Sequence, residues 1–134
     1  MNKKQSPEWY IAGTHWLTSM VSSAIFGAII LFILAAISQD VTILSIGTII
    51  IYPVVMWLAV RYSANFVNKR YIIVNPDHIV TLSTVFLVIV AGGYRGYSAL
   101  SSSGGMLVIA NAIGFFVALV IFYFASKKYV KKTT

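Results

Sequence analysis

The side chains best suited to bind a ligand fall between positions 61 and 70: Arg61, Asn65, Asn68, Lys69 and Arg70. On a continuous helix the first three share one face, because spacings of three and four residues bring side chains together. Guanidinium, ammonium and amide groups all donate hydrogen bonds to phosphate and sugar oxygens, and the arginine fork suits phosphate especially well. We therefore predict a site for a lipid phosphate or sugar here. The alternative for Arg61 is that its long side chain simply reaches the membrane surface.

A second candidate, Arg95, stands apart from the other basic residues. It follows the pair Gly92-Gly93, where a neighbouring backbone or lipid chain could approach closely. Either Arg95 pairs with Asp40 or reaches the membrane surface, or it binds a lipid-linked phosphate on the side opposite Arg61. Both interpretations remain open at this point.

Catalysis and metal binding need clusters of reactive groups that this sequence does not offer. The chain has no cysteine, and its three acidic residues, Glu8, Asp40 and Asp77, are far apart. We therefore predict no enzyme activity, no metal and no cofactor. A small proton-coupled exporter is disfavoured, because such a transporter needs a carboxylate deep in the membrane. His15 and His78 lie near the starts of predicted helices, and we interpret both as interfacial side chains.

The elements that must carry these residues are membrane-spanning helices. Hydrophobic residues make up 59% of the 134 residues and charged ones 10%, whereas a soluble domain has about 25% charged residues. A spanning helix needs about 20 mostly apolar residues, and four stretches meet or approach that length: 9–37, 41–62, 79–99 and 106–125. We predict an all-α membrane protein with four transmembrane helices, forming a single domain over residues 1–134.

Basic residues mark one side of these helices. Nine of the ten lie in the two tails or at and after the end of the second helix: Lys3, Lys4, Arg61, Lys69, Arg70, Lys127, Lys128, Lys131 and Lys132. The positive-inside rule places both termini and the 63–76 connection in the cytoplasm, as expected for a multi-pass protein of the cytoplasmic membrane. The charge follows the membrane boundaries and forms no soluble basic face, so we expect membrane lipids and no nucleic acid as partners.

An internal repeat indicates two helical hairpins of similar build. Residues 65–72 match residues 123–130 at an offset of 58, with identical Phe, Lys and Tyr. Two tandem hairpins would have the same orientation, since both second helices end on the same side. The alternative is that helix ends share an aromatic-basic-aromatic pattern for topological reasons alone.

Small residues recur every four positions on two of the predicted helices and predict close helix contacts. The two stripes are Ser19, Ser23 and Gly27, and Ala110, Gly114 and Ala118. They serve either the bundle itself or the interface of a homodimer. Four short helices enclose little volume, so a site for a large lipid would need a second copy or a partner.

The two repeated helix ends resemble the GtrA-like family of small four-helix membrane proteins. The matching positions are Asn65, Phe66, Asn68, Lys69, Arg70 and Tyr71, and then Ser126, Lys127, Lys128, Tyr129 and Val130. The chain departs from the family pattern where a final Phe is replaced by Ile73 and Lys131.

This resemblance implies a protein that translocates a polyprenyl-phosphate-linked sugar, or assists its translocation, for cell-surface glycan synthesis. It also implies a membrane glycosyltransferase as a partner. The alternative function is a structural or assembly subunit of a larger membrane complex. A polar cavity reaching Arg61 or Arg95 would distinguish the two, because a pure scaffold should lack one.

Overall fold

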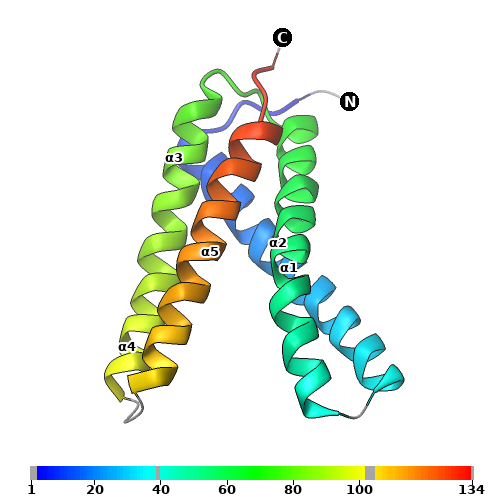
Figure 1. The fold of residues 1–134 in the computed structure, drawn as a ribbon. Helices are drawn as coiled ribbons and strands as arrows, with labels where there is room; N and C mark the ends of the chain where they lie inside the picture. The colour runs from blue at the N-terminus through cyan, green and yellow to red at the C-terminus, as the bar shows by residue number, and fades with distance from the viewer. Residues whose placement is uncertain (1–2, 39, 102–104, 134) are drawn as a thin grey trace.

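The computed structural model describes residues 3–38, 40–101 and 105–133, with side chains except at 41–49, 95, 99–100 and 105–111. The elements in chain order are α1 (Glu8–Ile37), α2 (Val41–Arg70), α3 (Pro76–Leu87), the π-helical turn η1 (Val88–Gly92), α4 (Gly93–Ser101) and α5 (Gly105–Tyr129). Because η1 joins α3 directly to α4, the chain forms four rods (Figure 1). Each contains a helix long and apolar enough to cross a membrane. The described residues are all-helical apart from the connections, as predicted, and the four spans support a multi-pass membrane protein.

The second helix is longer than its hydropathy predicts. The predicted helix ends at residue 62, whereas α2 continues to Arg70 and the connection to α3 shrinks to residues 71–75. Neither glycine nor proline interrupts residues 63–70, so nothing local stops the helix where its apolar run ends. Lys69 and Arg70 in the last turn complement the negative end of the helix dipole. The fall in hydropathy therefore does not mark the end of this helix, which lies further on at Arg70.

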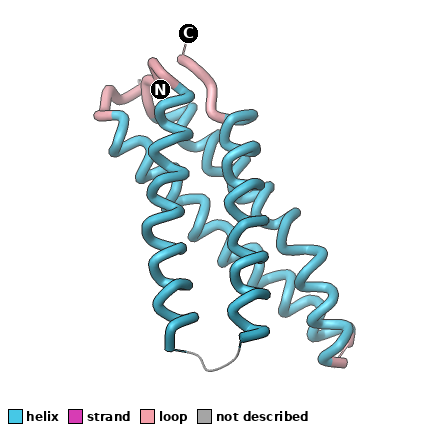
Figure 2. The backbone as a smooth tube through the Cα atoms, turned by 60° about the vertical axis from the view of Figure 1, so that its left-hand side comes forward, coloured by secondary structure: helices cyan, strands magenta, loops and turns pink. Residues whose placement is uncertain are grey.

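The rods form two hairpins, α1 with α2 and α3–α4 with α5. Both chain termini lie at one end of the molecule, which we call the terminal end, and the opposite end is the loop end (Figure 1). The hairpins pack together at the terminal end and diverge toward the loop end, as both views show (Figure 2). Each hairpin therefore has a packed terminal half and a separate loop half.

Burial follows the same division. Among the described side chains, no buried residue occurs on α1 beyond Ser22, on α2 before Val55, on α3 beyond Leu87 or on α5 before Ala118. The apolar side chains of the loop halves are instead exposed, with Phe32 at 78%. In a bilayer these side chains contact lipid tails, which are as apolar as they are.

The two tails are fastened to the connection between α2 and α3. The backbone N–H of Lys4 donates to the Arg70 carbonyl at 2.8 Å, and that of Ile72 donates to the Lys4 carbonyl at 3.0 Å. On the other side, the Thr133 N–H donates to the Ile73 carbonyl at 2.8 Å, and the Ile73 N–H donates to the Thr133 hydroxyl at 2.9 Å. The basic tails are thereby held against the bundle.

Candidate functional site

Two cations and two aromatic rings meet where α2 lies against the end of α5. We call Trp57, Arg61, Lys128 and Tyr129 the cation–aromatic cluster. The Trp57 indole N–H donates to the Tyr129 hydroxyl at 3.2 Å, and the two rings pack edge to face. The Arg61 guanidinium carbon lies 5.6 Å from the centroid of the Tyr129 ring. The Lys128 ammonium lies 5.5 Å from the Trp57 centroid and 5.6 Å from the Tyr129 centroid.

The helices place these groups by simple spacing. Trp57 and Arg61 are one turn apart on α2, so they share a face. Lys128 and Tyr129 occupy the last turn of α5, where a cation also complements the helix dipole. Cross-helix contact between Arg61 and Tyr129 then completes the cluster.

The two cations of the cluster, Arg61 and Lys128, are exposed. Their partners are neutral aromatic rings, which do not neutralise the positive charge. Glu8 pairs with His78 at the starts of α1 and α3. Asp77 belongs to the first turn of α3, and Asp40 adjoins the start of α2 at the loop end. In the described part of the chain, no carboxylate pairs with Arg61 or Lys128.

An apolar groove continues from the cluster toward the loop end. It has a volume of about 390 Å³ and is lined by Pro53, Val54, Trp57, Leu58 and Ile121. Trp57 belongs to both the cluster and the groove, so a charged rim adjoins a hydrocarbon-lined surface. Such an arrangement suits an amphiphile that has an anionic head and an apolar chain.

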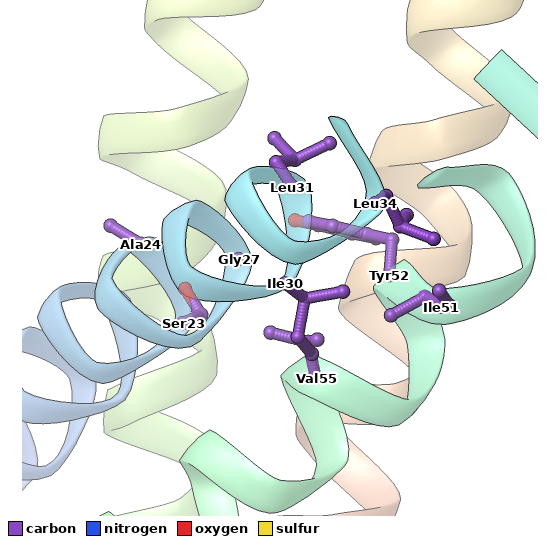
Figure 3. Close-up of a pocket in the computed structure, with 9 residues that line it drawn as sticks. All are labelled: Ser23, Ala24, Gly27, Ile30, Leu31, Leu34, Ile51, Tyr52 and Val55. Carbon is purple, nitrogen blue, oxygen red and sulfur yellow. The ribbon is translucent and has the colours of Figure 1, made fainter. Parts of the chain in front are cut away.

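Two further cavities lie between α1 and α2. The first, about 210 Å³, is lined by Ser23, Ala24, Gly27, Ile30, Leu31, Leu34, Ile51, Tyr52 and Val55. Figure 3 shows Tyr52 reaching from α2 across to α1 at this cavity. The second, about 330 Å³, shares Ile30 and Val55 with it. Both are apolar and neither is lined by Arg61.

The predicted ligand residues on α2 have different surroundings. Arg61 belongs to the cation–aromatic cluster, while Asn65 and Lys69 are exposed. Arg70 is also exposed, and its guanidinium carbon lies 5.4 Å from the centroid of the Phe66 ring. Of this set, only Arg61 joins the cation–aromatic cluster, whose Trp57 also lines the groove.

Asn68 holds the C-terminal segment. Its side-chain N–H donates to the Tyr129 carbonyl at 2.7 Å, and its side-chain oxygen accepts from the Lys131 N–H at 3.1 Å. The nitrogen and the oxygen of the Asn68 amide are therefore both hydrogen-bonded to the backbone at and just after the end of α5. Asn68 acts on the cluster indirectly, by positioning the end of α5.

Arg95 lies in α4, at the opposite end of the molecule from Arg61 (Figure 1). The structure describes the backbone of Arg95 but not its side chain. The two arginines belong to different ends, so they do not form one site.

The small-residue stripe on α1 packs closely only near the terminal end. Ser19 is buried, Ser23 is half-buried, and a Cβ added at Gly27 would meet no atom within 4 Å. The stripe thus opens into the cavity of Figure 3. On α5, Ala118 is buried and Gly114 is half-buried, and the predicted contact at Ala110 falls outside the described side chains.

His15 is fully buried, contrary to its interpretation as an interfacial residue. Its Nδ1 lies 2.9 Å from the Ser63 hydroxyl on α2, and its Nε2 lies 2.9 Å from the Ser126 hydroxyl on α5. The Ser63 hydroxyl also donates to the His15 backbone carbonyl at 2.6 Å. Because the Ser63 hydroxyl proton is used in this bond, the Ser63 oxygen can only accept from the ring. We therefore assign Nδ1 as the donor to Ser63 and Nε2 as the acceptor from Ser126 in the neutral ring. We call these three residues the histidine node.

The sequence contains a partial signal for this node. Ile11, Ala12, His15, Ser19 and Ser22 are all buried on α1, and their spacing of three and four residues marks one helix face. That spacing identifies a buried face with a histidine on it. It does not identify the serines on two other helices that the ring would meet.

In comparisons with known proteins, no family model matches the chain, no curated protein is similar to it, and no solved structure matches it. The geometry of the cluster and its groove is therefore the basis for the function proposed below. The chemistry available there is binding of an anion beside a surface that accepts hydrocarbon.

Proposed function

We propose that the protein binds a polyprenyl-phosphate-linked sugar at the cation–aromatic cluster and translocates it, or assists its translocation, across the cytoplasmic membrane for cell-surface glycan synthesis. The observation that supports this most directly is the pair of exposed cations, Arg61 and Lys128, in a cluster whose Trp57 also lines the apolar groove. The phosphate would bind the cations, and the polyprenyl chain would lie in the groove. The basic terminal end would face the cytoplasm.

A comparison of magnitudes favours phosphate binding at this position. A cation over an aromatic ring at an exposed site contributes about 0.5–1 kcal/mol. A hydrogen bond to a charged group contributes about 1.5–3 kcal/mol. A phosphate would therefore draw Arg61 and Lys128 from their rings, and Trp57 and Tyr129 would remain beside the bound head group.

A structural subunit of a larger membrane complex is the second candidate. It is favoured by the apolar lining of the described cavities, since a scaffold needs no polar cavity. In that case the cations of the cluster would only mark the membrane surface, and their removal would leave lipid binding unchanged.

The two candidates differ in their response to loss of charge. Binding of a short-chain polyprenyl phosphate to the purified protein in lipid nanodiscs is measured by native mass spectrometry. The variant R61A/K128A should bind roughly 10- to 100-fold more weakly, because each of the two cations exchanges a ring contact for a stronger charge-assisted hydrogen bond when the phosphate binds. Lys127→Ala is the matched control, because this lysine lies over Tyr123, outside the cluster. The uncharged polyprenol should bind equally to all three proteins.

Equal phosphate-lipid binding by R61A/K128A and the unmodified protein would reject the site. A second assay, in reconstituted vesicles, follows transfer of a polyprenyl-phosphate sugar between leaflets. We expect Arg61→Ala to abolish transfer, and Arg95→Ala to do the same if a second phosphate site exists at the loop end. Normal binding together with absent transfer in the unmodified protein would support an accessory role.

A further inference from the structure

Among the described side chains, the buried contacts between the two hairpins lie in the terminal half. Across the hairpins, the histidine node joins α1 to α5 through His15 and Ser126. Nearby, the Ser83 hydroxyl of α3 donates to the Ala12 carbonyl of α1 at 3.1 Å. The node and the bond from Ser83 make the terminal half a base that contains all four rods.

In the described part of the chain, each hairpin has a site that weakens the regular helix hydrogen bonding, Pro53 in α2 and η1 after α3, and both lie at the edge of this base. In α2, Pro53 precedes Val55, the first buried residue among the described side chains of that helix. In the other hairpin, η1 begins directly after Leu87, the last buried residue of α3. Proline removes a backbone hydrogen bond and bends a helix, and π-helical turns interrupt the regular ladder, frequently at functional sites.

The packing beside this edge leaves one polar group without a partner. The indole N–H of Trp16 is buried and donates to no acceptor in the described structure. Its ring lies 6.3 Å from that of Phe86 on α3, just before η1. An unpaired buried donor costs about 1–3 kcal/mol, so the packing of α1 against α3 next to η1 is less stable than a fully hydrogen-bonded contact would be.

We propose that the loop halves of the two hairpins form a gate that bends at Pro53 and at η1, while the histidine node fixes the base. This gate is independent of the proposed lipid binding, because it concerns the movement of the two hairpins and not the identity of the ligand. Opening widens the separation between the ends of α1 and α4, and closing brings their exposed apolar side chains together. The packed terminal half stays unchanged in both states.

The natural chain has no cysteine, which permits spin labelling without background. Labels at Ile37→Cys on α1 and Ser98→Cys on α4 report the separation of the loop halves. Labels at Leu17→Cys and Lys127→Cys report the base. All four positions are exposed. Distances are measured by double electron–electron resonance in nanodiscs.

We expect a broad or two-component distribution for the loop-half pair and a single narrow one for the base pair. Pro53→Ala restores a helix hydrogen bond, so it should narrow or shift the loop-half distribution and leave the base pair as it is. Ser126→Ala, which removes one hydroxyl from the node, should broaden the base pair.

Two results would overturn the gate. One is a single narrow loop-half distribution that Pro53→Ala does not change. The other is an equal change in both label pairs with Pro53→Ala, because that would show loosening of the whole bundle. Pro53→Ala favours helix formation, so loss of folding is not expected to obscure the result.

Discussion

Ser63 and Ser126 both form a hydrogen bond with the His15 ring, but with different roles. The Ser63 hydroxyl accepts from Nδ1 and also donates to the His15 carbonyl. The Ser126 hydroxyl is bonded to Nε2. The His15 carbonyl accepts a second hydroxyl, that of Ser19, at 2.8 Å. Ser63 therefore sets the tautomer of the ring, and Ser126 connects that ring to the other hairpin.

This difference predicts unequal costs for two otherwise similar substitutions. Ser63→Ala leaves the buried Nδ1–H unpaired and should reduce the free energy of unfolding by about 1–3 kcal/mol. Ser126→Ala removes one interhelical hydrogen bond and should cost about 0.6 kcal/mol, the average for such bonds in membranes. Unfolding of both variants in mixed micelles, followed by circular dichroism, gives the comparison.

Exposed Ser98→Ala serves as the control and should be close to neutral. Equal losses from Ser63→Ala and Ser126→Ala would contradict the assigned tautomer. A larger loss of stability from Ser126→Ala would indicate the opposite tautomer, with the proton on Nε2.

At the scale of elements, the end of α2 organises the end of α5. Asn68 binds the backbone at Tyr129 and Lys131, one and three residues after Lys128 of the cluster. The two similar helix ends, residues 65–72 and 123–130, contact each other here, and the asparagine at the end of α2 caps the end of α5.

Loss of this contact should release the C-terminal segment. Asn68→Ala removes two hydrogen bonds, together about 1–3 kcal/mol, so trypsin should cleave after Lys131 and Lys132 roughly 10-fold faster if cleavage follows local opening. Mass spectrometry of the trimmed chain measures the rate. Asn65→Ala is the matched control, since Asn65 is exposed one turn earlier on α2. Identical rates for the two variants would show that other contacts hold the tail.

At the scale of the whole molecule, both tails emerge at the end that carries nine of the ten basic residues (Figure 1). The bundle is packed at this end and splayed at the other. Exposed apolar side chains cover the loop halves, so most of the surface is suited to hydrocarbon.

The charge asymmetry predicts the orientation in the membrane. In intact cells, a membrane-impermeant maleimide should label Asp40→Cys and should not label Lys3→Cys or Lys132→Cys until the cells are opened, because basic segments are retained in the cytoplasm. The reverse pattern would place the cation–aromatic cluster on the outer face. Labelling of all three in intact cells would indicate both orientations.

The sequence alone determined the number of spanning rods, the all-helical class and the end at which basic residues gather. These are properties of composition and local hydropathy, and a membrane leaves a chain of apolar stretches few alternatives to helices. Arg61 was predicted as a ligand residue on the same basis, as a cation at the end of an apolar helix.

Only the tertiary structure decided which side chains meet. His15 lies 48 and 111 positions from its serine partners, and the position of Lys128 beside Trp57 depends on how α2 crosses α5. Hydropathy and spacing identify the face of one helix but not its neighbour, since many pairings bury the same apolar surface. The sites of this protein arise between helices, where packing geometry and hydrogen bonds select one pairing.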